Sequence, residues 1–144
     1  MRLHYLTPVI LIMLLFLSCS PAKKLNRTAG KADITMVSTD KDSTEYEIII
    51  IDPGFQSWFE SHRKPEWYYT KEYLANWNNQ YVTAWNIKYH NTQFQAENPD
   101  SPFWEPIDYR LGVDYGMDVN YKLYNYFLFV EATWGRILPY DRRN

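Results

Sequence analysis

Residues 70–89 read TKEYLANWNNQYVTAWNIKY, and this stretch decides the fold. An aromatic residue stands at every fourth position, at Tyr73, Trp77, Tyr81, Trp85 and Tyr89. This spacing predicts an α-helix, in which each step of four turns the row by about 40° around the axis. Thr70 is a typical N-cap residue, so the helix should begin there and run to about Tyr89. Its apolar half is wider than one neighbour can cover, so either several elements pack on it or one flank is open to a ligand.

A second long helix is predicted for Val119–Trp134, with Asp118 as its cap and Gly135 after its end. Its apolar positions form one stripe: Val119, Leu123, Tyr126, Phe127, Val130 and Trp134. Leu128 and Phe129 lie off that stripe, so we expect this helix to be covered on more than one side. Phe55–Ser61 predicts a short helix, which Asp52 caps and Pro53 begins.

Residues 45–51 read EYEIIII and predict a strand that is buried on both faces. A lone strand cannot pair its backbone groups, so it needs a partner. The two candidates are Ile34–Val37 and Arg136–Tyr140. Prolines at positions 99, 102 and 106 indicate a loop over residues 90–106, and residues 107–118 are turn-like. The fold class predicted is α+β and mostly helical: two long amphipathic helices and one short helix, packed with a small β-sheet.

The chain begins with the layout of a cleaved export signal. Arg2 supplies a positive charge, and Leu6–Leu17 is an almost unbroken apolar run, shorter than the ~20 residues that a membrane-spanning helix needs. The run ends at Phe16-Leu-Ser-Cys19, which resembles a lipobox with Phe16 in place of the usual leucine. Cys19 is the only cysteine in the chain, so no disulfide is available to the domain. We therefore expect residues 1–18 to be a lipoprotein signal peptide and Cys19 to carry the acyl chains that hold the protein on a membrane.

Residues 19–44 are polar and charged, which predicts a lipid-anchored flexible tether, and residues 45–144 form one globular domain. No Asp follows Cys19, and by resemblance to known lipoprotein sorting this favours the outer membrane. No acidic cluster of the kind that marks surface-exposed lipoproteins follows either, so we expect the periplasmic face.

Three parts of the domain carry a resemblance to a known family: Tyr46–Phe55, Trp67–Asn86, and Ile107–Tyr109 through Asp114–Gly116 to Val119–Phe127. Together they resemble an uncharacterised family, a domain of unknown function, of small bacterial lipoproteins. The resemblance covers most of residues 45–135 and agrees with the anchor at Cys19. It implies no activity and no functional residues.

Several chemistries find little support in the sequence. The formal net charge of −2 does not suggest nucleic-acid binding. Two histidines remain beyond residue 18, so no metal ligand set and no cofactor is predicted. A repeat at Ile107-Asp-Tyr, Val113-Asp-Tyr and Val119-Asn-Tyr would offer calcium the oxygens of Asp108, Asp114, Asp118 and Asn120, but its spacing of six does not fit an EF-hand. We interpret it as a turn-rich approach to a helix.

Eighteen per cent of the residues are aromatic, and this excess is the most suggestive feature for function. Five aromatics fall outside the helix stripes and are candidate ligand contacts: Trp58, Trp67, Tyr68, Tyr69 and Trp104. Exposed Trp and Tyr stack on sugars or anchor protein partners, although the same residues could simply cover a small core. Four acids, Asp52, Glu60, Glu66 and Glu72, keep glycoside hydrolysis open as a hypothesis. We expect a non-enzymatic structural or binding role with an envelope protein or glycan; the alternative is glycan or peptidoglycan binding or hydrolysis.

Overall fold

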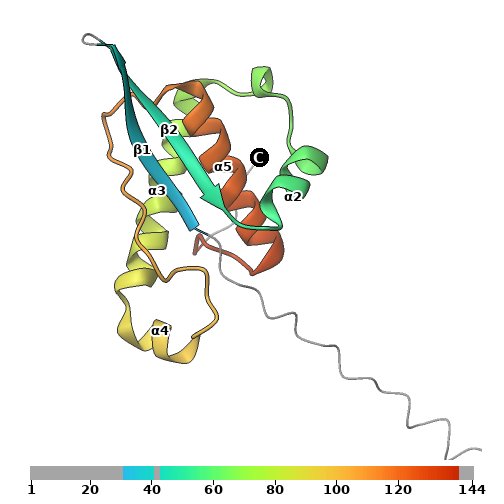
Figure 1. Cartoon of the computed structure of the whole chain (residues 1–144). Helices are drawn as coiled ribbons and strands as arrows, with labels where there is room; N and C mark the ends of the chain where they lie inside the picture. The colour runs from blue at the N-terminus through green and yellow to red at the C-terminus, as the bar shows by residue number, and fades with distance from the viewer. Residues whose placement is uncertain (1–30, 41–42, 140–144) are drawn as a thin grey trace, which may run out of the picture.

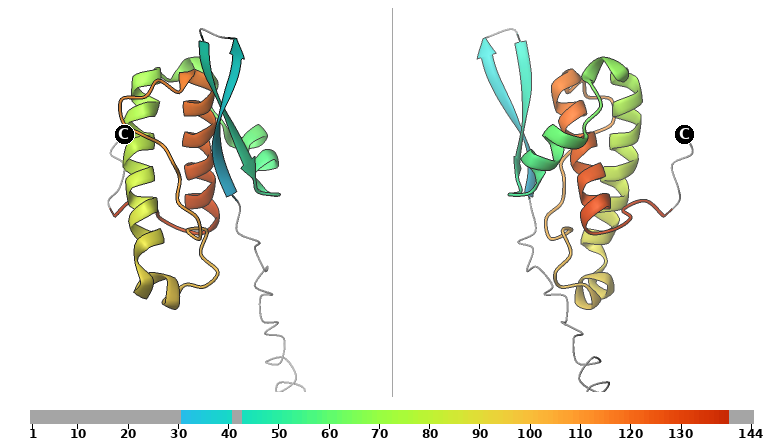
Figure 2. Two further views of the ribbon diagram at one scale, coloured as in Figure 1. Left: turned by 60° about the vertical axis from the view of Figure 1, so that its left-hand side comes forward. Right: turned by 90° about the vertical axis from the view of Figure 1, so that its right-hand side faces the viewer.

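The computed structural model describes residues 31–40 and 43–139, with side chains from residue 45 onward. The elements in chain order are β1 (Lys31–Asp40), β2 (Ser43–Ile51), α2 (Phe55–His62), the 3₁₀ turn η2 (Glu66–Tyr68), α3 (Lys71–His90), α4 (Thr92–Glu97) and α5 (Gly116–Thr133). The predicted class, α+β and mostly helical, is confirmed (Figure 1). Helix α5 lies in the middle, with α3 on one side and the two-stranded ribbon and α2 on the other (Figure 2).

Helix α5 is the centre because its sequence is apolar almost all round. Ten of its 18 residues are buried, among them Phe129, which lies off the predicted stripe. The expectation that several elements cover this helix is therefore confirmed. The helix begins at Gly116 rather than Val119, because Gly116 adopts a φ of +76° that reverses the chain just ahead of it. Asp118 does not cap the helix; it sits in the first turn and pairs with Lys122 at 2.9 Å.

Helix α3 begins where predicted. The Thr70 side chain accepts a hydrogen bond from the Tyr73 backbone N–H at 3.1 Å. The drift of the aromatic row is visible in its burial: Tyr73 is 43% exposed, whereas Tyr81 and Trp85 are buried. Tyr81 stacks on Phe127 of α5, with ring centroids 4.8 Å apart. The middle of the row thus packs on the core, whereas Tyr73 near its N-terminal end is partly exposed to solvent.

Strands β1 and β2 pair in antiparallel register, with Ile34 opposite Ile48. Of the two candidate partners for the isoleucine strand, Ile34–Val37 lies within β1, and residues 136–139 form no strand. The predicted tether is therefore too long, because residues 31–40 and 43–44 belong to the ribbon; the remainder of it lies outside the described residues. Burial on both faces is also wrong. Ile48 faces α5, but Ile49 and Ile51 are 46% and 64% exposed, because none of the helices that the structure describes covers the other face of the ribbon.

The loop predicted for residues 90–106 contains one helix that the prolines do not prevent. Asn91 caps α4 by accepting a hydrogen bond from the Phe94 backbone N–H at 2.9 Å, and the first proline comes only after the helix has ended. The following segment is held by α3. Trp85 Nε1 donates to the Glu105 carbonyl, and the Asn86 amide both donates to and accepts from the Ile107 backbone, at 3.0 and 2.9 Å.

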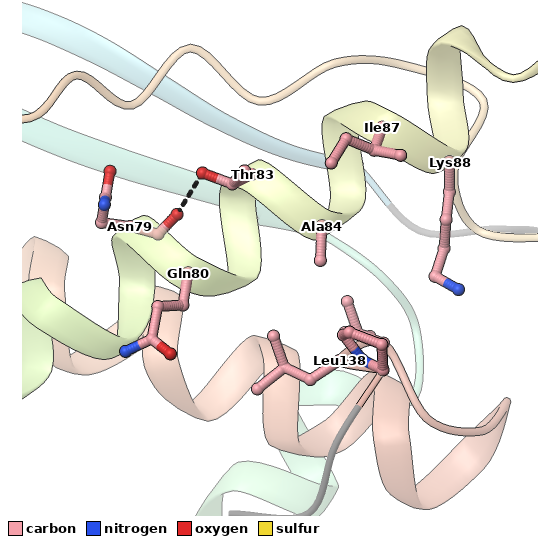
Figure 3. Close-up of a pocket in the computed structure, with 9 residues that line it drawn as sticks. Asn79, Gln80, Thr83, Ala84, Ile87, Lys88 and Leu138 are labelled. Carbon is pink, nitrogen blue, oxygen red and sulfur yellow. Dashed lines mark hydrogen bonds between the residues drawn. The ribbon is translucent and has the colours of Figure 1, made fainter.

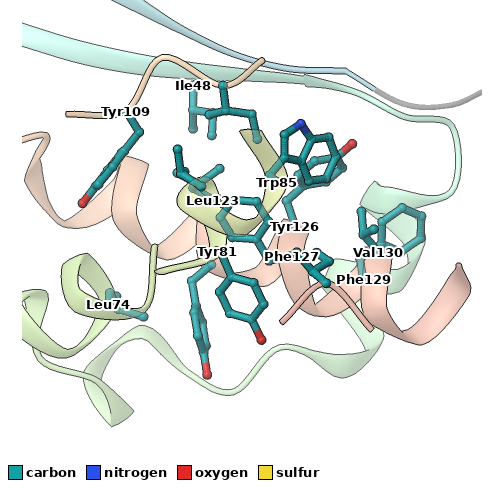
Figure 4. Close-up of a cluster of buried hydrophobic side chains, with 14 of the residues drawn as sticks. Ile48, Leu74, Tyr81, Trp85, Tyr109, Leu123, Tyr126, Phe127, Phe129 and Val130 are labelled. Carbon is teal, nitrogen blue, oxygen red and sulfur yellow. The ribbon is translucent and has the colours of Figure 1, made fainter. Parts of the chain in front are cut away.

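The core is built mainly from aromatic rings of α3, α5 and α2 (Figure 4). A buried polar network lies beside it. Asn78 Nδ2 donates to Asn120 Oδ1 at 3.1 Å, and the Tyr109 hydroxyl donates to the same oxygen at 2.8 Å. Burial raises the pKa of Tyr109 to about 12, so its hydroxyl stays a donor. Because these groups pair only in one arrangement, they fix how α3, α5 and the preceding loop meet.

We expect Trp85→Ala to lower the free energy of unfolding by about 3–5 kcal/mol, because it deletes a buried ring and the hydrogen bond to Glu105. Trp104→Ala is the matched control, since this side chain is 48% exposed and should cost less than about 1 kcal/mol. Chemical denaturation followed by circular dichroism measures both. Equal losses in the two variants would contradict this account of the core.

Candidate functional site

The five candidate aromatics do not form one surface. Trp67, Tyr68 and Tyr69 are consecutive, at η2 and just before α3. Trp58 belongs to α2, where it is half-buried, stacks on His62 with centroids 5.0 Å apart and touches Phe129. Trp104 lies near the other end of α3. It follows Phe103, whose ring contacts Trp85, and Trp85 is 15 residues or ~22 Å along the helix from Thr70. The structure therefore separates one group of three from two single residues.

Tyr69 anchors the group of three. Its ring stacks on Tyr73 at 5.7 Å and meets Tyr124 of α5 edge-on at 5.5 Å. Tyr69 is thus part of the core boundary, and the two residues before it are held outward. Trp67 is 83% exposed and Tyr68 is 55% exposed. We call these three residues the aromatic corner.

A polar hollow of about 300 Å³ lies next to the aromatic corner. Its lining comes from α2, from the link to η2 and from α5: Glu60, Arg63, Pro65, Glu66 and Tyr121. The hollow thus brings together two of the four acids considered from the sequence, and the corner continues directly from Glu66. Asp52 and Glu72 are elsewhere. Asp52 accepts a hydrogen bond from the Gly54 backbone N–H, but it does not cap α2 as predicted, because Gly54 is the N-cap and Pro53 lies before the helix. Glu72 lies in the first turn of α3.

Tyr121 forms the inner wall of the hollow. Its hydroxyl donates to the carbonyl of Lys64, which fixes the link between α2 and η2. Burial raises the pKa of Tyr121, so the hydroxyl remains protonated. The Arg63 guanidinium lies 4.7 Å from the centre of the Phe59 ring, and the Lys64 ammonium lies 4.1 Å from that of Tyr68. Each of these two neighbouring cations thus lies against an aromatic ring.

The hollow suits the binding of a hydroxyl-rich ligand better than its cleavage. A carboxyl group that acts as a general acid is usually kept in an apolar pocket, away from water. Glu60 and Glu66 are both exposed. Exposed carboxylates accept hydrogen bonds from hydroxyl groups, a guanidinium donates them, and the neighbouring rings offer flat apolar faces.

Arg63 and Tyr121 were not anticipated as site residues. Tyr121 belongs to the repeat at residues 107–121, where the sequence indicates a packing role. Arg63 lies in the link between α2 and η2, which contains no motif. Only the folding of that link against α5 brings them together.

The acids of the repeat do not gather around a common point. Asp108 pairs with Arg110, Asp114 with Lys71, and Asp118 with Lys122, at 3.0, 2.6 and 2.9 Å. Asn120 is taken up by the buried polar network. Within residues 31–40 and 43–139 no group of three or more His, Cys, Asp or Glu is arranged to hold a metal ion. The calcium hypothesis therefore finds no support in the geometry of these residues.

Comparison with known protein families assigns the chain to a family. A family model described as "Family of unknown function (DUF6146)" matches residues 7–139. The chain belongs to this family. Its match begins inside the expected signal peptide and ends where the described residues end. No curated protein and no solved structure was found that matches the chain.

Among the described residues, no helix of this family member has the length and apolarity to cross a membrane. The expected signal peptide and Cys19 lie outside the described residues.

We expect Tyr121→Phe to lower the free energy of unfolding by about 0.5–1.5 kcal/mol, because the Lys64 carbonyl loses its donor. It should also speed amide hydrogen exchange in residues 63–69. Tyr126→Phe is the matched control on the same helix, since the structure gives the buried Tyr126 hydroxyl no partner among the described residues. Chemical denaturation measures the unfolding free energy, and hydrogen exchange with mass spectrometry measures the exchange in residues 63–69. Unchanged exchange in residues 63–69 would show that Tyr121 does not hold the link.

Proposed function

We propose that this protein is a bacterial lipoprotein of the cell envelope, anchored by acyl chains on Cys19, and that its domain binds another envelope component without catalysing a reaction. The support for the anchor is the short apolar run before a solitary cysteine. By the residues that follow the cysteine, the periplasmic face of the outer membrane is the proposed location. The domain then works within reach of both the membrane and the cell wall.

The observation that carries the binding role is the exposure of Trp67. A tryptophan offers more apolar surface than any other side chain, and one that is 83% exposed contributes little to the core. Tyr68 stands beside it, and the Tyr68 ring meets the ring of Tyr69, which itself packs on Tyr124 of α5. Preformed, outward-facing rings are the usual anchors of binding surfaces. We therefore assign binding to the aromatic corner.

The second candidate function is the binding of a glycan, such as a peptidoglycan strand. The aromatic corner and the polar hollow beside it favour this class of ligand. Sugar rings present an apolar face to aromatic side chains and hydroxyl groups to polar ones. The aromatic corner supplies the aromatic side chains, and Glu60, Arg63 and Glu66 supply the polar ones. A protein partner would use the same rings but would not need this polar set.

The anchor is tested with Cys19→Ala in the full chain. We expect the variant to remain uncleaved or to leave the membrane fraction, because the acyl chains have no site of attachment. Cell fractionation with an antibody to the domain, and mass spectrometry of the amino terminus, measure the result. Ser20→Ala is the control and should be processed and retained. A Cys19→Ala chain that is cleaved and still membrane-bound would overturn the anchor.

The binding role is tested with the double variant Trp67→Ala, Tyr68→Ala. We expect it to lose most of its sedimentation with purified cell-wall sacculi and to keep the wild-type melting temperature, because both side chains are exposed. Trp104→Ala is the control, since it removes an exposed tryptophan from a different part of the domain. If the double variant sediments like the wild type, glycan binding at the corner is wrong. Crosslinking in cells then shows whether a neighbouring protein is captured by the wild type and lost in the double variant. If no crosslink is lost, the aromatic corner is not a binding surface.

A further inference from the structure

A second hollow, of about 490 Å³, lies on the other half of α3, between this helix and residues 137–139. Gln80, Ala84 and Lys88 extend from the helix toward Leu138 (Figure 3). Because they are four residues apart, they follow one side of the helix over ~12 Å. Ala84 is the middle residue of this row, and its single methyl group leaves the space that a longer side chain would fill.

The opposite wall is fixed before any ligand arrives. Ile137 and Leu138 are buried, and the Ile137 backbone N–H donates to Glu131 Oε1 at 3.2 Å. The other oxygen of Glu131 accepts a hydrogen bond from the hydroxyl of Tyr81, at 2.9 Å. The segment is thus tied to the buried middle of the aromatic row. Preformed walls of this kind are typical of small-molecule sites, because little ordering is needed on binding.

The hollow is apolar along its length and carries charge at one end. Ala84, Ile87, Ile137, Leu138 and Pro139 supply apolar surface, and Asn79, Gln80 and Thr83 supply uncharged polar groups. Lys88 is the one charged residue among the nine that line it, and no carboxylate is among them. Its ammonium lies 5.1 Å from the Phe94 ring centre and 5.5 Å from that of Phe103, so two aromatic rings lie beside it.

We propose that this hollow binds an anionic amphiphile, with the apolar chain along Ala84 and Leu138 and the acidic group at Lys88. Charge complementarity selects this ligand. A cationic amphiphile would meet Lys88, and a neutral one would leave the ammonium without an anion. The ligand chemistry could come from a free fatty acid or from an acidic phospholipid. The proposal rests on neither the anchor nor the aromatic corner, which lies at the opposite end of α3.

The probe for this site is dodecanoate with a photoreactive diazirine on its chain. The full chain is reconstituted in phosphatidylcholine vesicles, irradiated with the probe, and digested for mass spectrometry. We expect crosslinks in the peptides that contain residues 80–88 and 136–139, and competition by unlabelled dodecanoate. Crosslinks spread evenly over the surface, or equal competition by dodecyltrimethylammonium, would overturn the proposal.

Four variants separate binding at this site from non-specific binding to the surface. Ala84→Trp fills the hollow and should abolish the crosslinks there; Ala84→Leu is the milder version if circular dichroism shows that the first does not fold. Ser57→Trp is the control, since it adds the same ring at an exposed position of α2, which lies on the other side of α5 from α3, and should leave the crosslinks unchanged. Lys88→Gln should lower labelling by about tenfold and remove the preference over dodecanol, because a charge-assisted contact is lost. Full labelling in Ala84→Trp, or in Lys88→Gln, would reject the site or the role of its charge.

Two further arms identify the source of the ligand. Vesicles that carry a photoreactive phosphatidic acid replace the free acid in one arm, and labelling of the same peptides there would assign the site to membrane lipid. Labelling by dodecanoate alone would assign it to free fatty acid. If neither probe labels the full chain, but removal of residues 140–144 permits labelling, the hollow belongs to the end of the chain itself and the proposal is wrong.

Discussion

Tyr81 of α3 and Phe127 of α5 lie ring on ring, with their planes tilted by only 15°, and both are fully buried. An aromatic side chain of this size removes roughly 150–250 Å² from water, so this pair and its neighbours dominate the stability of a small domain. Every other part of the structure packs on the two helices that the pair joins. The ribbon and α2 lie against α5, and α4 lies against α3. The packing of α3 on α5 thus provides the surface on which the other elements assemble.

The Tyr81 side chain of this pair also positions one wall of the apolar hollow. Above the ring, the Tyr81 hydroxyl donates to Glu131, and Glu131 accepts from the backbone of Ile137. This chain of two hydrogen bonds positions the wall of the apolar hollow. One turn earlier on α3, the buried amide of Asn78 bonds to Asn120 and fixes the register of the helix pair. The helices cannot slide without breaking both.

The aromatic excess therefore has two uses that the sequence alone does not separate. Most of the rings form the core of a domain whose chain contains one cysteine, at position 19, and hence no internal disulfide. A few are held outward by the buried ones. Tyr69 is the link between the two sets, because its ring packs on Tyr124 of α5 while its neighbours Trp67 and Tyr68 are exposed to solvent.

The sequence by itself determined the elements whose signals are local: α3 from its spacing of four and from Thr70, α2 from the turn before Phe55, and the all-round cover of α5 from Phe129. It predicted a cleaved leader and a lipid anchor by the same kind of local pattern. It could not choose between β1 and the chain end as the partner of β2, nor show that Ile49 and Ile51 are exposed, because strand pairing and burial depend on residues far apart in the chain. For the same reason only the tertiary structure decided that Glu60, Arg63, Glu66 and Tyr121 share one hollow, and that Ala84 and Lys88 face Leu138 across another. Spacing along a helix fixes which side chains share a face, but what that face meets is set by packing.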